Sequence, residues 1–164
     1  MALLEVAGLE VRFDTEDGVV HAVDGVSLEL ERGQVLGLVG ESGSGKSVTA
    51  LTLLGLTRSR ATTIAGSATF DGRDLLALRD AELRTVRGDG VAMIFQDPMS
   101  SLHPFFTVGD QLVEAVRAHR DVGREQARER AAEMLERVGI PDPRGRLRAY
   151  PHELSGGMRQ RVMI

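Results

Sequence analysis

The sequence contains no cysteine, no tryptophan and no asparagine, and only 4% of its residues are aromatic. Without cysteine, a disulfide framework, an iron–sulfur cluster and a thiolate zinc site are all excluded. No apolar run approaches the roughly 18 residues that span a bilayer, and the N-terminus lacks the basic segment of a signal peptide. The histidines are too scattered for a local metal motif: His21, His103, His119 and His152. These absences predict a cytosolic protein without a structural metal.

Lysine is almost absent as well, because Lys46 is the only lysine among the 20 basic residues. Arginine and lysine are nearly interchangeable on a solvated surface, so the arginine excess indicates coding preference. The single lysine instead suggests a role that a guanidinium cannot fill. Residues 117–164 are net basic, but their arginines alternate with glutamates along a helical pattern. A solvated helix face is therefore favoured over a nucleic-acid surface.

The pattern of apolar residues changes along the first half of the chain. Residues 9–13 and 26–30 alternate with period two, which predicts half-buried antiparallel strands. Residues 35–39 and 91–95 are almost continuously apolar, which predicts strands buried on both faces. An apolar helix is expected over 48–56. A further strand is expected over residues 64–70, and a short helix after it with Asp80 as its N-cap.

The second half of the chain has helical periodicity. Thr107 and Asp110 have the spacing of a capping box, and an apolar stripe follows within residues 112–116. A second stripe over 127–138 stops before Gly139 and Pro141. The chain is therefore expected to be strand-rich in residues 1–96 and helical in residues 97–164.

A glycine-rich motif lies between the strand expected at 35–39 and the helix that follows it. Its residues are Gly40, Glu41, Ser42, Gly43, Ser44, Gly45, Lys46 and Ser47, which match G-x-x-x-x-G-K-[ST]. Glycines let successive backbone N–H groups turn inward around a phosphate, and the helix adds the positive end of its dipole. Lys46 is then predicted to reach the β- and γ-phosphates and Ser47 to ligate Mg²⁺. A compact ammonium suits this position better than a planar guanidinium.

The phosphate loop alone does not identify the function. GTP-binding switches of the Asn-Lys-x-Asp type are excluded because the chain has no asparagine. A small-molecule kinase stays open at this point. The second half of the chain supplies another glycine-rich motif, Leu154-Ser155-Gly156-Gly157. Ser155 at an N-cap, followed by two glycines that leave the amides unobstructed, builds a second anion site at a helix start.

Together these motifs resemble the nucleotide-binding domain of ATP-binding cassette (ABC) transporters. The resemblance covers essentially the whole chain, and residues 95–102 and 150–164 are most similar to the oligopeptide and dipeptide importer branch. It implies an α/β, P-loop NTPase fold of ABC type. That fold has an antiparallel β subdomain, a mixed core sheet and an α-helical subdomain. Residues 1–96 would form the β subdomain and phosphate-loop core, and residues 97–164 the helical subdomain with the signature.

The resemblance also implies roles for individual residues. Gln96 would be the loop glutamine that meets Mg²⁺ and the attacking water, so Lys46 and Gln96 are the catalytic candidates. Ser155, Gly156 and Gly157 would close over the γ-phosphate held by a partner domain. Phe13 is the candidate for stacking on adenine, with an ordinary core position as the alternative. Asp97 is assigned no catalytic role, and His103 and Met158 are loop and signature variants.

By this resemblance the protein is an ATP-hydrolysing subunit that powers an importer of peptides or similar small solutes. Its expected partners are a second nucleotide-binding domain packed head to tail, transmembrane permease subunits and, indirectly, a substrate-binding protein, with no nucleic acid. It would lie peripherally on the cytoplasmic face of the cell membrane. Two alternatives stay open: an ABC ATPase outside transport, or an ATP-binding fragment without activity.

The family places an aspartate-ended strand, a catalytic glutamate and a distal histidine after the signature. These are not found in this sequence, which ends within an apolar helical run at Ile164. We therefore expect a C-terminally incomplete fold. We also expect little ATP hydrolysis by these residues alone.

Overall fold

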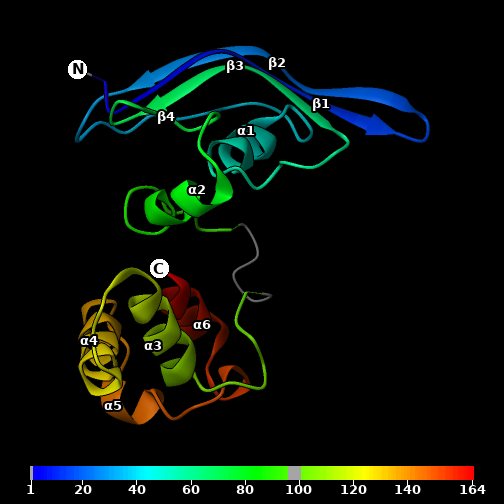
Figure 1. Ribbon diagram of the computed structural model, residues 1–164. Coiled ribbons are helices and arrows are strands. Elements are labelled where there is room, and N and C mark those ends of the chain that lie inside the picture. The colour runs from blue at the N-terminus through cyan, green and yellow to red at the C-terminus, as the bar shows by residue number, and fades with distance from the viewer. Residues whose placement is uncertain (1, 96–100) are drawn as a thin grey trace. The chain divides into compact units, whose positions relative to one another are not determined.

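The computed structural model describes residues 2–95 and 101–164 and divides the chain into two compact units, Met1–Val91 and Ala92–Ile164. The first unit contains the strands and two helices, and the regular elements in the described part of the second unit are helices (Figure 1).

The first unit is built on a four-stranded antiparallel sheet with the order β2-β1-β3-β4. Its strands are β1 (Leu4–Thr15), β2 (Gly18–Leu30), β3 (Thr62–Phe70) and β4 (Arg73–Asp74). β1 pairs along most of its length with both β2 and β3. The period-two segments at 9–13 and 26–30 and the strand expected at 64–70 are thus confirmed.

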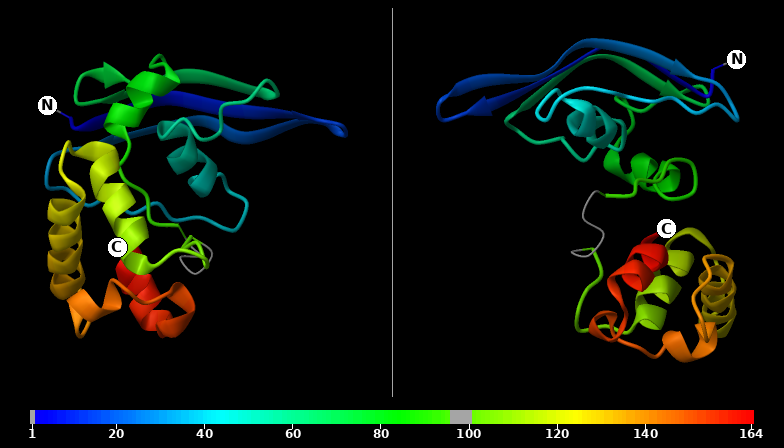
Figure 2. Two further views of the ribbon diagram at one scale, coloured as in Figure 1. Left: turned by 60° about the horizontal axis from the view of Figure 1, so that its bottom comes forward. Right: turned by 180° about the vertical axis from the view of Figure 1, so that it is seen from behind.

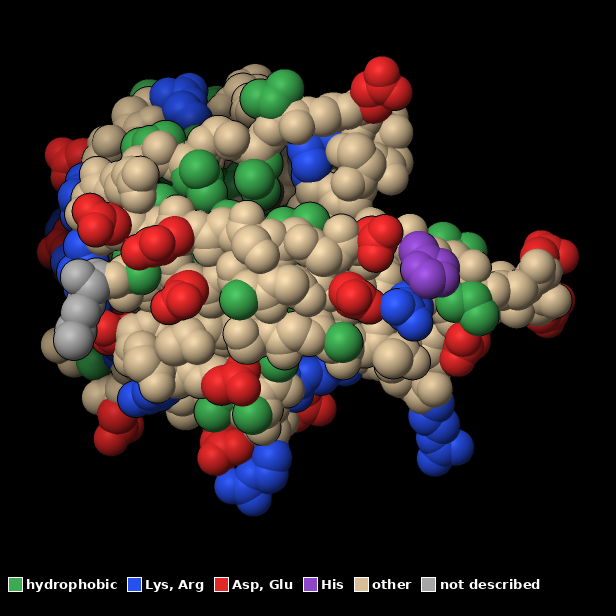
Figure 3. Space-filling view, turned by 90° about the horizontal axis from the view of Figure 1, so that it is seen from above, with side chains coloured by type: hydrophobic (Ala, Val, Ile, Leu, Met, Phe, Trp, Pro, Cys, Tyr) green, Lys and Arg blue, Asp and Glu red, His purple; other side chains and the backbone are tan. Residues whose placement is uncertain are grey.

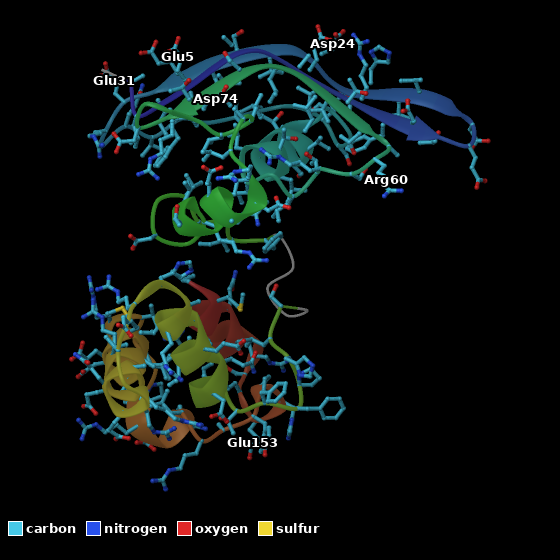
Figure 4. The ribbon with its side chains drawn as sticks, in the orientation of Figure 1. Glu5, Asp24, Glu31, Arg60, Asp74 and Glu153 are labelled. Carbon is cyan, nitrogen blue, oxygen red and sulfur yellow. The ribbon has the colours of Figure 1, made fainter. Side chains whose placement is uncertain are left out.

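The two faces of this sheet differ in chemistry. One face buries apolar side chains and is covered by α1 (Lys46–Leu53) (Figures 1 and 2). The opposite face carries many carboxylates (Figure 3), and Glu5 and Asp24 point away from the sheet on the side opposite α1 (Figure 4). The buried apolar core residues of the strands are Val6, Leu9, Val11, Val23 and Ala68. Val48 and Leu53 of α1 therefore pack against the apolar core of the sheet.

Two predicted strands are wrong. Residues 35–39 form no strand, and Val35 and Val39 are 94% and 99% exposed. In the segment 91–95, only Val91 pairs, in an isolated parallel bridge with Arg87. A strand buried on both faces needs hydrogen-bonded neighbours and covering layers, and none pairs with 35–39 among the described residues. Among the described residues the sheet is antiparallel, and residues 35–39 and 91–95 do not form a mixed core sheet.

The short helix α2 (Asp80–Val86) follows the sheet, and its N-cap is Arg79 rather than the predicted Asp80. The Glu82 carboxylate accepts hydrogen bonds from the Arg79 backbone N–H at 2.9 Å and from its guanidinium Nε at 3.1 Å. The side-chain bond from Arg79, followed by the backbone bond, holds the pKa of Glu82 below its ordinary value of 4.5. The N-terminus of α2 is thus supplied with negative charge by its own first turn.

The second unit contains α3 (Val108–His119), α4 (Arg124–Arg137), α5 (Pro143–Arg146), the 3₁₀ helix η2 (Pro151–Glu153) and α6 (Gly156–Met163) (Figure 2). The Thr107 hydroxyl caps α3 by accepting from the Asp110 N–H at 3.1 Å, as predicted. The apolar stripes of α3 and α4 meet in one core that also includes Leu154 and Val162. Within residues 2–95 and 101–164, no helix is both long and apolar enough to cross a membrane.

Candidate phosphate-binding site

The glycine-rich loop at 40–47 has a backbone that only glycine adopts without strain. Gly43 and Gly45 have φ angles of +82° and +87°, in the left-handed region. A Cβ added to Gly45 would lie 2.3 Å from the carbonyl oxygen of Ala22 on β2. The strand therefore presses directly against the loop, and glycine at position 45 is what permits this approach.

Lys46 folds back over the loop rather than pointing into solvent. Its Nζ donates to the carbonyl oxygens of Gly40 and Glu41, both at 2.7 Å, and to the Ser44 hydroxyl at 3.0 Å. The ammonium has three donors, and all three are used. A single cation is therefore held at the centre of the loop by neutral oxygens, with no carboxylate among these partners.

The N-terminus of α1 opens directly onto this loop. Its N-cap is Gly45, which has no side chain with which to cap the helix, and the first turn contains no acidic residue. The first N–H groups of a helix lack intrahelical acceptors, so those of α1 are left for an external anion. Thr49 anchors the turn from inside, because both its N–H and its hydroxyl donate to the Gly45 carbonyl, at 2.8 and 3.0 Å.

This donor set fits a bound polyphosphate. The amides at the helix start and the ammonium of Lys46 supply positive potential, and the next residue, Ser47, is exposed and carries a hydroxyl. A hydroxyl next to bound phosphates suits Mg²⁺, which takes only a few ligands from the protein and the rest from phosphate and water. In the described part of the chain, no cluster of three or more His, Asp or Glu side chains could hold a metal ion.

Phe13 lies on β1 in the same unit as the phosphate loop. It pairs with Val20 on β2, two residues before Ala22, the residue that contacts the loop. Its ring is partly buried and packs against the apolar core of the sheet. The strand continues to Thr15, two residues beyond the segment 9–13 expected from the sequence. Its predicted role at adenine stays a prediction.

The loop glutamine candidate, Gln96, lies outside the described residues, as does Asp97. The segment that follows is held by Gln111, whose side-chain amide accepts from the His103 N–H at 2.9 Å and donates to the His103 carbonyl at 3.0 Å. The His103 ring packs beside Phe106, with ring centroids 4.8 Å apart. These contacts fit a loop position for His103.

The signature residues lie at the start of α6 in the second unit. Ser155 is the N-cap, and its hydroxyl accepts from the Met158 N–H at 3.3 Å. Ser155, Gly156 and Gly157 are all exposed, and a Cβ added to Gly157 would meet nothing within 4 Å. The predicted helix start is confirmed. Arg159 lies beside it, and its Nε donates to the Leu154 carbonyl at 3.1 Å.

Arg161 ties the signature helix to the end of α4, a role that no pattern in the sequence predicts. Its Nη1 donates to the Gly139 carbonyl at 2.6 Å, beyond the end of α4, and its Nε to the Gly157 carbonyl at 3.3 Å. Because arginine is so frequent in this chain, an arginine with a structural role cannot be told from a solvated one by sequence alone. A glycine that ends one helix and a basic residue on another would have been the only available signal.

Comparisons with known proteins agree with this arrangement. Residues 23–164 match the ABC transporter family. The chain is 51% identical to the oligopeptide transport ATP-binding protein OppD of Salmonella typhimurium, over 99% of this chain and 48% of that protein. It is 49% identical to the dipeptide transport ATP-binding protein DppD of Escherichia coli, over 100% of this chain and 50% of that protein. The chain thus spans about half the length of these curated relatives.

A solved structure has a similar fold. The dimeric structure of MJ0796, a bacterial ABC transporter cassette, matches with a TM-score of 0.82 and 25% identity, over 98% of this chain and 67% of that chain.

Proposed function

The chain belongs to the ABC transporter family, and from that premise we propose that its phosphate loop binds the phosphates of ATP with Mg²⁺. The observation that carries the proposal is the Lys46 ammonium, held by three neutral oxygens beside the uncapped N-terminus of α1. A cation and free amides at one place are the donor set that a polyphosphate requires.

On this proposal each residue has a defined task. Lys46 would exchange its bonds to the Gly40 and Glu41 carbonyls for bonds to the β- and γ-phosphates. The amides at the start of α1 donate to the phosphate oxygens. Ser47 supplies one oxygen to Mg²⁺, which when bound neutralises charge on the phosphates. Phe13 contacts the base, and Gln96 meets the metal and the attacking water.

The second unit is proposed to act in trans. Ser155, Gly156 and Gly157 are exposed, and a Cβ on Gly157 would meet nothing within 4 Å, so these residues can approach the phosphates held by another copy of the domain. The first unit would serve as the nucleotide-binding core and the second as the helical subdomain. A dimeric arrangement is in keeping with the dimeric MJ0796 cassette.

We further propose that the ATP-hydrolysing protein powers import of peptides or similar small solutes. The names of the relatives support this: an oligopeptide and a dipeptide transport ATP-binding protein. Its partners would then be membrane-spanning permease subunits, served by a substrate-binding protein. The protein would work at the cytoplasmic face of the membrane.

Titration of the chain with a fluorescent ATP analogue and Mg²⁺ tests the binding step. Lys46→Ala should weaken binding roughly ten- to a hundredfold, the effect of losing charge-assisted hydrogen bonds to phosphate. The matched control is Arg84→Ala, which removes an exposed cation from α2 in the same unit and should leave the affinity unchanged. Equal affinities for the wild-type chain and Lys46→Ala would refute the phosphate-loop assignment.

A further inference from the structure

The C-terminal end of α1, opposite the phosphate loop, is closed by a specific backbone motif. The Gly55 N–H donates to the Thr52 carbonyl at 2.8 Å and the Leu56 N–H to the Leu51 carbonyl at 2.9 Å, while Gly55 has a φ of +65°. This is the pattern of a Schellman ending. It occupies two of the last carbonyls of the helix and leaves that of Leu54, a residue that is only 7% exposed.

Arg87 supplies the partner for that carbonyl. Its Nε donates to the Leu54 oxygen at 2.7 Å. A Cβ added to Gly55 would lie 2.6 Å from Leu83 Cδ1 and 3.2 Å from Arg87 Nη2, so the glycine admits both side chains. A cation at the C-terminus of a helix also interacts favourably with the negative end of its dipole. Arg87 therefore holds the end of α1 by a directed bond and by charge.

Arg58 reinforces the same corner. Its Nη1 donates to the Leu78 carbonyl at 2.6 Å, and its Nη2 to the carbonyls of Leu75 and Leu76 at 2.8 and 3.0 Å. Its Nε would lie 3.3 Å from a Cβ on Gly55. The backbone between β4 and α2 is thereby tied to the chain just after α1.

Arg87 also makes backbone contacts outside α1. Arg87 ends α2, where its N–H donates to the Leu83 carbonyl at 2.8 Å. It also forms the isolated bridge with Val91, the last residue of the first unit. Arg87 therefore links the phosphate-loop helix, through its side chain, to the last residue of the first unit, through its backbone.

We propose that Arg87 is a positioning residue for the phosphate loop, acting from the far end of α1. The helix has eight residues, about 12 Å at 1.5 Å per residue, so its two ends move together. When its C-terminal end is fixed, the loop is held ready for phosphate. When that end is released, nucleotide binding must also order the helix, and the affinity falls. The inference rests on the proposed ATP binding at this loop.

Nucleotide titrations of matched variants of the full chain test this role. Arg87→Met keeps the apolar stem and removes the donor, and we expect it to raise the Kd for the Mg²⁺–ATP analogue about fivefold, part of the effect of one charge-assisted hydrogen bond. Arg87→Lys retains a donor and a charge and should stay within about twofold of the wild type. Arg84→Met, on the exposed face of the same helix, should not change the Kd.

A purely structural role gives a different result: Arg87→Met would unfold at a lower temperature but bind with the wild-type Kd while folded, and this would overturn the proposal. If Arg87→Met does not fold, hydrogen exchange on the wild-type chain decides. Nucleotide should slow exchange of the Gly55 and Leu56 amides, and unchanged exchange there overturns the proposal. Wild-type affinity in Lys46→Ala would overturn the proposed function as well, whereas loss in Lys46→Ala with none in Arg87→Met overturns only the role of Arg87.

Discussion

Two eight-residue helices, α1 and α6, each begin after a glycine-rich segment, but they begin differently. At α1 the N-cap is Gly45 in the left-handed region, without a side-chain cap, and a lysine is folded over the loop. At α6 the N-cap is Ser155 in an extended conformation, and its own hydroxyl caps the helix. One helix start is left open with a cation in place, and the other is already capped.

The two helix starts differ in their caps: the first turn of α1 has no side-chain acceptor, whereas that of α6 has the Ser155 hydroxyl. The first N–H groups of α1 lack intrahelical acceptors, whereas the Lys46 ammonium would have to exchange its bonds to the loop oxygens before it could reach a phosphate. At α6 the Ser155 hydroxyl already accepts from the Met158 N–H, and two arginines, Arg159 and Arg161, donate to the backbone carbonyls of Leu154 and Gly157. The start of α2 differs from that of α1, which has no acidic residue in its first turn. At α2 the Glu82 carboxylate supplies negative charge and accepts from the N-cap N–H.

The largest expected effect comes from placing a side chain at Gly45, the N-cap of α1. Gly45→Ala places a methyl group 2.3 Å from the Ala22 carbonyl at a φ of +87°. We expect a loss of about 2 to 4 kcal/mol in unfolding free energy, and nucleotide affinity should fall with it. Urea unfolding and analogue titration measure the two effects.

The matched substitution at the other helix start should be tolerated. Gly157→Ala adds a methyl group that meets nothing within 4 Å, inside α6. Because alanine is the better helix former, the unfolding free energy should be unchanged or raised by up to about 1 kcal/mol. Equal losses in both variants would contradict the distinction between the two segments.

A smaller effect is expected from removing the cap of α6. Ser155→Ala leaves the Met158 N–H without its acceptor, which should cost about 1 kcal/mol of unfolding free energy. Binding of the ATP analogue to the phosphate loop of the isolated chain should not change. Ser155→Asp, which restores an acceptor, is the control and should recover the stability. A weakened affinity in Ser155→Ala would mean that the signature already contributes to the first site.

The smallest effect is a dependence on pH at α2. The pKa of Glu82 is lowered in the folded chain, so its contribution is complete above the ordinary value of 4.5 and is lost as the pH falls through the lower folded value. Amide exchange in the first turn of α2 should therefore become less protected in that acid range, relative to Glu82→Gln. The first turn of α1, which has no acidic residue, should show no matching change.

Local chemistry was predictable from the sequence where neighbouring residues determine it. The loop at 40–47, the capped start at Ser155 and the Thr107 cap each depend on residues a few positions apart. The sequence predicts the N-cap of α2 at Asp80, one residue after the observed N-cap, Arg79. The Glu82 carboxylate accepts from the Arg79 N–H, so the N-cap residue itself needs no carboxylate.

What could not be predicted depends on distant partners. An apolar run such as 35–39 has the composition of a buried strand, but pairing requires a neighbour elsewhere in the chain, which period and composition do not reveal. Likewise, the bonds from Arg87 to Leu54 and from Arg161 to Gly139 join residues 33 and 22 positions apart. No local pattern distinguishes these arginines from solvated ones.

The most direct test is hydrogen exchange of the wild-type chain with and without Mg²⁺ and ATP, at concentrations where the chain is monomeric. If the phosphate loop binds alone and the signature acts only on a partner, the nucleotide should slow exchange across residues 40–49 and leave residues 155–158 unchanged. Protection at 155–158 in the monomer, or no protection at 40–49, would contradict the account.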